Sequence, residues 1–238
     1  MKSLVAPWMV PWPGYAGTTY PGAPHVDAVP QPPHPGPPQT QRAHYDATTV
    51  HAIIDQALVC QIAFNQGGSV HCLPTACWRD GDHLYIHGAN NSRLTQTLLT
   101  DDCAVSITHL DGLVLARSAF HHSMNYRSVV IYGHFEEVTD TDAKAAAFRS
   151  FVDHVSPGRA ARVRLPSPAE IAGTRLLRIP LDEAVAKIRN WGVEDSADDM
   201  EIPVWAGVMP LTLTAGPLQP ETGCAGRELP QKPMGVSG

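Results

Sequence analysis

Apolar and polar positions alternate, or recur with helical spacing, through the middle of the chain. Alternation rich in β-branched and aromatic residues predicts strands at 59–65, 69–78, 83–88, 103–110 and 126–138. Apolar residues three and four positions apart predict helices at 47–58, 91–100 and 140–155. We expect Asp46 to cap the first helix, and Asp140 or Thr141 to cap the third.

Residues typical of tight turns lie between the first three predicted strands. Gly67-Gly68 and Asp80-Gly81-Asp82 are typical of tight hairpins, so these strands form an antiparallel meander. Residues 166–173 predict a short helix, whereas residues 111–125 fit neither period.

The last part of the pattern is extended. Residues 174–189 read as an extended stretch, although EAVAKI within it could be helical on propensity alone, and 204–213 is expected to close the core. Five or six antiparallel strands with helices inserted between them predict a mainly β fold, a barrel with peripheral helices.

Both ends of the chain differ from this middle part. Eleven of the 22 prolines lie in residues 1–43, which predicts a disordered Pro-rich tail, and residues 217–238 predict a flexible C-terminal tail. One domain is therefore expected at 44–216.

Charge and cysteine content narrow the class of protein. The net charge is −6 without a basic stripe, which argues against nucleic acid as the partner. No apolar run approaches the roughly 18 residues of a membrane helix. The odd number of cysteines predicts buried free thiols, including Cys60 and Cys103, and a cytoplasmic protein.

The segment from Tyr85 to Leu94, YIHGANNSRL, carries the clearest candidate chemistry. A strand ends there, Gly88 permits close backbone approach or a positive φ, and a helix starts near Ser92. Ser92 adds a hydroxyl, and Arg93 adds a forked cation that suits phosphate. The segment is a candidate phosphate-binding corner, and the alternative is an ordinary capped helix with a solvent-facing arginine.

Three segments together resemble the pyridoxamine 5′-phosphate oxidase superfamily, in its flavin-nucleotide-binding branch that includes nitroimidazole-resistance proteins. They are RDGDHLYIHGANNSRL, DGLVLARSAFHHSMNYRSVVIYG and VWAGVMPL, and the similarity runs from about His44 to Pro210. The resemblance implies FMN, a split β-barrel, and a homodimer that holds the flavin between its subunits.

The same resemblance implies the residues of the site. The phosphate-binding residues fall on His87, Gly88, Ser92 and Arg93. A second contact strand places Arg127 and Ser128 near the phosphate or the isoalloxazine ring, and a third segment places Pro74, Thr75 and Ala76 along that ring. Leu94 stands where the vitamin B6 oxidases carry Lys, and their Arg-containing substrate motif has no good counterpart near Trp205, so pyridoxamine phosphate is not the expected substrate.

A dense polar stretch, SAFHHSMNYRS, supplies the catalytic candidates His121, His122 and Tyr126. A histidine facing the flavin or a substrate pocket could donate a proton near neutral pH. Alternatively, one histidine satisfies buried backbone groups and the other is exposed. Arg117 in the same stretch could pair with Asp111. Trp205 is a core or interface aromatic, or it packs over the flavin edge.

Three functions remain open from the sequence. The first is an FMN-dependent oxidoreductase of a small organic substrate, with reduced nicotinamide or a deazaflavin as electron donor. The second is a flavin carrier or sensor without turnover. The third is a heme-binding split barrel, with a histidine such as His121 as axial ligand. Metal-site spacings such as HExxH or CxxC are not present in the sequence.

Overall fold

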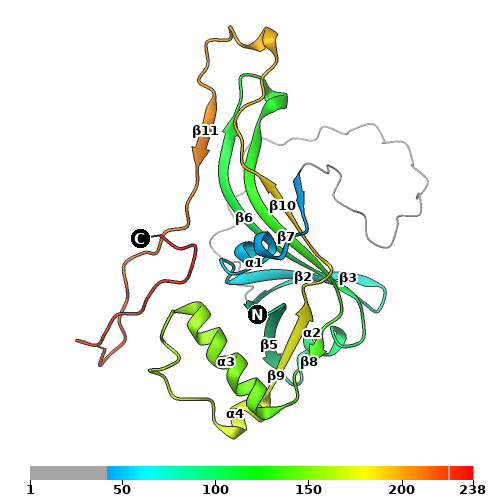
Figure 1. Ribbon diagram of the computed structural model, residues 1–238, viewed down its shortest axis with the longest axis vertical. Helices are drawn as coiled ribbons and strands as arrows, with labels where there is room; N and C mark the ends of the chain where they lie inside the picture. The colour runs from blue at the N-terminus through cyan, green and yellow to red at the C-terminus, as the bar shows by residue number, and fades with distance from the viewer. Residues whose placement is uncertain (1–41, 225, 238) are drawn as a thin grey trace, which may run out of the picture. The chain divides into compact units, whose positions relative to one another are not determined.

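Two antiparallel sheets share one apolar core in the computed structural model, which describes residues 42–224 and 226–237 (Figure 1). All of these residues lie in the compact unit 36–238. The larger sheet has the order β1 (Ala43–His44), β10 (Ala184–Arg189), β7 (Ser123–Gly133), β6 (Cys103–Leu115), β2 (Val59–Gln66) and β3 (Ser69–Ala76), and β11 (Gly207–Pro210) also pairs with β6. The smaller sheet has the order β4 (Trp78–Asp80), β5 (His83–Ala89), β9 (Thr174–Pro180) and β8 (Glu136–Glu137).

The core lies where the two sheets face each other. Ile62, Val105 and Ile131 of the larger sheet pack with Leu84 and Ile86 of the smaller one, and all five side chains are fully buried. Because side chains alternate along a strand, the core takes Leu84 and Ile86 and leaves Tyr85 and His87 on the other face of β5.

Local sequence signals explain the longer helices. Asp46 accepts the Thr49 N–H at 2.8 Å and starts α1 (Ala47–Ile54). Asp140 accepts the Ala143 N–H at 2.8 Å and starts α3 (Thr141–Val155). Both capping predictions are confirmed, with Asp140 rather than Thr141 capping α3. A capping box from Ser167 and Glu170 starts α4 (Pro168–Gly173).

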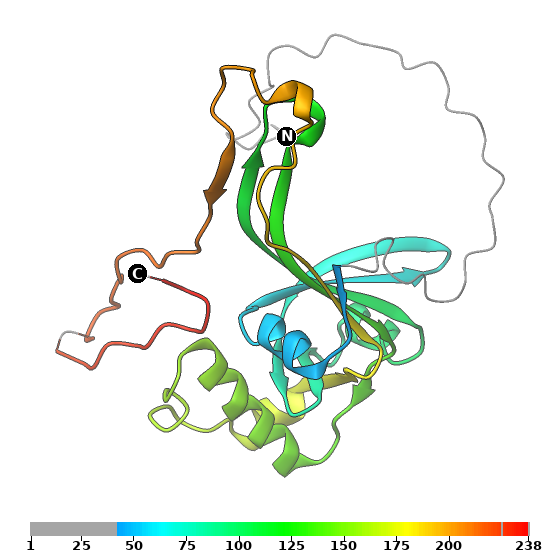
Figure 2. The same ribbon diagram turned by 45° about the horizontal axis from the view of Figure 1, so that its top comes forward.

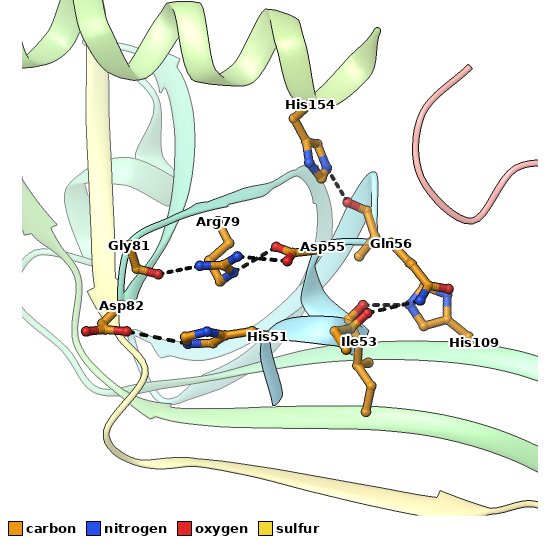
Figure 3. A network of polar contacts seen from close by, with 11 residues as sticks. His51, Ile53, Asp55, Gln56, Arg79, Gly81, Asp82, His109 and His154 are labelled. Carbon is orange, nitrogen blue, oxygen red and sulfur yellow. Dashed lines mark hydrogen bonds and ion pairs between the residues drawn. The ribbon is translucent and has the colours of Figure 1, made fainter. Parts of the chain in front are cut away.

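Polar contacts tie α1 to its surroundings (Figure 3). Arg79 donates two hydrogen bonds to Asp55 at 2.7 Å, and one to the Gly81 carbonyl at 2.7 Å. Just beyond α1, the Ala57 carbonyl accepts a bond of 2.7 Å from His154 on α3. These contacts fix α1 against the β4–β5 turn and α3.

The far halves of β6 and β7 extend beyond the sheet as a paired arm, with β11 beside β6 (Figures 1 and 2). We call β6–β7 beyond the bulge at Leu110–Gly112 the arm. Residues 111–125 therefore complete β6, form a 3-10 turn at Ala119–His121, and begin β7.

Four sequence expectations are corrected by the structure. The helix expected at 91–100 shortens to α2 (Arg93–Thr97), and the helical option for EAVAKI is wrong because β10 pairs with β7 and β1 there. The segment 204–213 does not close the core, since β11 lies on the arm with Met209 48 % exposed. Arg117 pairs with Asp195 at 2.9 Å and not with Asp111.

The predicted disordered tail falls almost wholly on residues 1–41, outside the described residues.

Cys60, Cys77 and Cys103 are buried and free, as the sequence predicted for Cys60 and Cys103, while Cys72 and Cys224 are exposed. A hydrogen bond with Cys77 and burial raise the pKa of the Cys60 thiol far above its ordinary value, and burial raises the pKa of Cys103 to about 12. No described helix is long and apolar enough to cross a membrane.

Candidate functional site

The start of α2 and the β2–β3 hairpin enclose a pocket of about 210 Å³. Its lining residues are Phe64, Gln66, His71, Leu73, Ser92, Arg93 and Leu94. We call this the corner pocket. Gln66 donates a hydrogen bond to Thr97 at 2.9 Å, which holds the hairpin against α2. The predicted phosphate-binding pair Ser92–Arg93 therefore lies at a pocket formed by two separate segments.

Ser92 and Arg93 are chemically available at this pocket. Ser92 is the N-cap of α2, yet its side chain makes no capping hydrogen bond. Arg93 is exposed, and its guanidinium has no hydrogen bond or ion pair with any described residue. Because α2 has only five residues, its dipole contributes little, and the positive charge of Arg93 provides the main attraction for an anion.

Gly88 is explained by packing. Its φ is not positive, and a Cβ at this position would lie 2.9 Å from Thr95 Cγ2. Thr95 is buried and bonds back to the Ala89 and Ser92 carbonyls, which positions the first turn of α2. Gly88 thus lets α2 sit close to β5 and places Arg93 at the corner pocket.

His87 lies on the other face of β5. Its ring contacts Trp78, Phe148 and Phe151, with centroids 5.9, 5.8 and 5.1 Å away. Burial lowers its pKa below the ordinary value. The structure therefore does not bring His87 into the pocket of Ser92 and Arg93, and its predicted flavin contact stays a prediction.

Arg127 is committed to partners within the chain. It donates to both carboxylate oxygens of Asp111 at 2.8 and 2.9 Å and to Gln56 at 3.0 Å. The hydrogen bonds to Asp111 raise the pKa of Arg127. This group lines a separate pocket of about 450 Å³ with His109 and Leu211. The neighbouring Ser128 hydroxyl donates to the Lys187 carbonyl at 3.3 Å.

Pro74, Thr75 and Ala76 lie on β3, the edge strand of the larger sheet. They directly follow Leu73, which lines the corner pocket. Pro74 is exposed, and Thr75 and Ala76 are half-buried. Their predicted position along a flavin ring is compatible with this edge, and it stays a prediction.

Two catalytic candidates, His121 and His122, lie at the turn that joins β6 and β7 at the end of the arm, whereas Tyr126 pairs with Leu110 at its base. His122 is exposed and its Nδ1 lies 2.9 Å from the Ser118 carbonyl, while the half-buried His121 ring contacts Phe120. Tyr126 lies beneath the Lys187 ammonium at 5.8 Å. Trp205 is 64 % exposed and packs over Gly207 next to the arm. None of these four residues lines the corner pocket.

Sequence reasoning missed the hairpin side of the corner pocket. Phe64 and His71 stack at 5.3 Å between ring centroids, and they face each other in the β2–β3 register. The Gly67-Gly68 turn, with φ of 59° and 79°, sets that register. Counting residues back from the turn predicts that the two rings face each other across the hairpin. It does not predict that they lie beside α2.

Comparisons with known proteins agree on one family. The family profile described as pyridoxamine 5′-phosphate oxidase matches residues 46–188. The solved flavocytochrome Anf3 from Azotobacter vinelandii is 36 % identical with a TM-score of 0.72, over 82 % of this chain and 89 % of that chain. The FAD and heme binding protein from Mycobacterium smegmatis is 33 % identical with a TM-score of 0.75, over 79 % and 94 % of the two chains.

A more distant structure shares the fold. A candidate 5-nitroimidazole antibiotic resistance protein from Bacteroides thetaiotaomicron is 19 % identical with a TM-score of 0.52, over 61 % of this chain and 86 % of that chain. None of the curated proteins searched matches the chain.

Proposed function

This chain belongs to the pyridoxamine 5′-phosphate oxidase family and has its split β-barrel fold, and on that premise we propose that it is a redox protein that binds a flavin and a heme. Two solved proteins support the proposal, because each is at least 33 % identical and is named for both kinds of cofactor. Flavin and heme supply the electron-transfer chemistry, and the protein binds and orients them.

The observation that supports flavin binding is the unpaired positive charge of Arg93 at the corner pocket. Eight other arginines of the described residues pair with a carboxylate, whereas Arg93 reaches a pocket without one. A phosphate there would accept a forked pair of hydrogen bonds from Arg93 and one from the Ser92 hydroxyl. Neither side chain has a partner within the described residues, so binding does not require an existing ion pair to break.

We propose FMN as the flavin on the strength of the sequence motif. FAD carries the same ribityl phosphate and is named for the Mycobacterium smegmatis protein, so the corner pocket suits either nucleotide. Mass spectrometry of the cofactor released from the purified chain identifies it. FAD in place of FMN would correct the nucleotide and leave the pocket assignment intact.

The proposed reaction is oxidation or reduction of a small organic substrate in a cytoplasmic homodimer, with a nicotinamide electron donor. Leu94 contacts the apolar core beside the corner pocket where the B6 oxidases carry Lys. This loss of a cation supports a substrate other than pyridoxamine phosphate.

An absorption spectrum of the purified full chain tests the proposal. We expect the two bands of a bound flavin together with the Soret band of heme. Anaerobic NADPH should bleach the flavin bands. A colourless protein that also fails to bind added flavin would overturn the flavin half, and flavin that no reductant bleaches would overturn the redox role.

A further inference from the structure

The hairpin wall of the corner pocket contributes a histidine that the family motif does not assign. His71 on β3 lines the pocket together with Ser92 and Arg93 at the start of α2. His71 and Arg93 are the two lining residues whose side chains can carry a positive charge, and none of the described residues that line the pocket is a carboxylate. A phosphate that enters the pocket therefore meets hydrogen-bond donors without an opposing negative charge.

Stacking on Phe64 fixes the orientation of the His71 ring. The two ring centroids lie 5.3 Å apart, and the ring planes differ by only 19°. One face of the imidazole is therefore covered, whereas its edge, which carries both nitrogens, is left open. Phe64 is itself buried in the apolar core, so the histidine ring rests on a fixed support.

Both nitrogens of the His71 ring are available to a ligand. Neither makes a hydrogen bond or an ion pair with a described residue, and neither is among the buried polar atoms without a partner. A neutral imidazole carries one N–H group and an imidazolium carries two, so the ring offers a donor in either protonation state. His71 thus stands at the corner pocket as Arg93 does, with a donor that no described residue uses.

A second pocket of the chain combines a histidine with an arginine and shows the difference a carboxylate makes. His87 and Arg164 line a cavity of about 300 Å³ beside α3 and α4, together with Glu170. Arg164 donates to both carboxylate oxygens of Glu170 at 2.8 Å, so its charge is already neutralised within the chain. The corner pocket has no such carboxylate among the described residues that line it, and its donors are free for an external anion.

The α2 wall of the corner pocket supplies fewer cations than the family motif does. Leu94 stands where the B6 oxidases carry Lys, and its side chain packs against the apolar core. Arg93 is therefore the single cation that α2 brings to the pocket. His71 provides a further donor from the hairpin, which the hydrogen bond from Gln66 to Thr97 holds against α2.

We propose that His71 binds the flavin phosphate in the corner pocket, donating a hydrogen bond from the β3 wall while Ser92 and Arg93 donate from the α2 wall. The inference rests on the proposed function and adds one residue to its phosphate site. It also gives the site a selectivity, because donors on two walls around one phosphate favour FMN over riboflavin, which has no phosphate.

Titration of the full chain, freed of bound flavin, with FMN and with riboflavin tests the assignment by flavin fluorescence. His71→Phe keeps an aromatic ring against Phe64 and removes both nitrogens. We expect FMN affinity to fall by about 10-fold, the effect of losing one hydrogen bond to a charged group, while riboflavin affinity stays unchanged. The ratio of the two affinities is the readout, because a general disturbance of the pocket lowers both.

Two further variants separate the donor from the ring. His71→Lys loses the ring and restores a cationic donor, so it should regain the preference for FMN. His83→Phe is the matched control, since His83 is a half-buried histidine of β5 that does not line the corner pocket, and it should bind both flavins as wild type does. Circular dichroism verifies that each variant is folded.

The outcomes distinguish this inference from the proposed function. An unchanged affinity ratio in His71→Phe would overturn the role of His71 and leave the flavin site at Ser92 and Arg93 standing. An equal loss for both flavins, or no regained preference in His71→Lys, would show that His71 acts through packing and would overturn the role as well. Failure of the wild-type chain to bind either flavin would overturn the proposed flavin function together with it.

Discussion

Arg93 and Arg127 carry the same guanidinium group in opposite surroundings. Arg127 donates to Asp111 and Gln56 within the larger sheet and α1 region, whereas Arg93 stands at the corner pocket without a described partner. The family motif assigns both to the flavin. The difference shows that a cation's availability depends on the register of its strand, because β6 and β7 place Asp111 beside Arg127 at a bulge.

Of the substitutions that distinguish Arg93 from Arg127, Arg93→Ala is expected to have the largest effect on flavin binding. Loss of a charged hydrogen-bond donor should weaken flavin binding by about 1.5–3 kcal/mol, with little change in the unfolding free energy of the apoprotein. Fluorescence titration with flavin measures it. Arg159→Ala is the matched control, since Arg159 is exposed and does not line the corner pocket. Equal flavin affinity in both variants would remove Arg93 from the site.

Gly88→Ala should disturb the corner pocket through packing. The new Cβ meets Thr95 Cγ2 at 2.9 Å, and we expect an overpacking cost of about 1–3 kcal/mol with weaker flavin binding. Thr95→Ser removes that methyl group and keeps the hydroxyl that bonds the Ser92 carbonyl. The double variant should therefore regain most of the loss in thermal melts. No regain would mean that Gly88 is needed for another reason.

Arg127→Ala should act on stability more than on flavin. Removing it leaves Asp111 and Gln56 without their partner, and we expect the unfolding free energy to fall by about 1–2 kcal/mol. Asp111→Asn breaks the same ion pair and keeps the arginine. If Arg127→Ala releases flavin and Asp111→Asn does not, the contact implied by the family motif is real and the contrast with Arg93 disappears.

A third arginine extends the comparison to the arm. Burial acts to raise the pKa of Asp195, but hydrogen bonds from the Arg117 backbone and side chain outweigh it and lower that pKa. The ionised contact therefore stabilises the arm above the ordinary value of about pH 3.9, and is lost as pH falls through the lowered pKa. The amide resonance of Arg117 should shift over that acidic range. Asp195→Asn should abolish the shift.

The smallest effect is expected from deletion of residues 1–40. The deletion leaves β1 at Ala43–His44, α1 and both arginine sites in place. Flavin content, melting temperature and oligomeric state should match those of the full chain. A loss of solubility or of dimerisation would show that the segment has a role beyond the barrel.

Local signals predicted much of the fold because they act within a few residues. Asp46 and Asp140 each accept a hydrogen bond from a backbone N–H at the start of a helix, and Gly67-Gly68 forms the tight turn between β2 and β3. Each of these predictions is confirmed. EAVAKI was ambiguous because its residues favour a helix, although helix propensity is a weak preference that strand pairing outweighs. In the structure β7 and β1 pair with it on either side and hold it extended.

The site depends on contacts that no local pattern contains. Alternation along β5 already separates His87 from the core residues Leu84 and Ile86, so the face of His87 was predictable. The partner of Arg127 was not, because it depends on the bulge between Leu110 and Gly112. Phe148 and Arg164 are distant in sequence from His87, and only the packing of α3 and α4 on the smaller sheet joins them.

The uneven burial of the thiols makes the protein suitable for selective labelling. Cys60, Cys77 and Cys103 are shielded, and the raised pKa values of Cys60 and Cys103 keep those two sulfurs out of the nucleophilic thiolate form. Cys72 is exposed on β3 between His71 and Leu73, whose side chains line the corner pocket from the other face of that strand. With Cys224→Ser, a maleimide dye would attach at Cys72 alone in the folded chain, where it reports occupancy of the corner pocket without entering it.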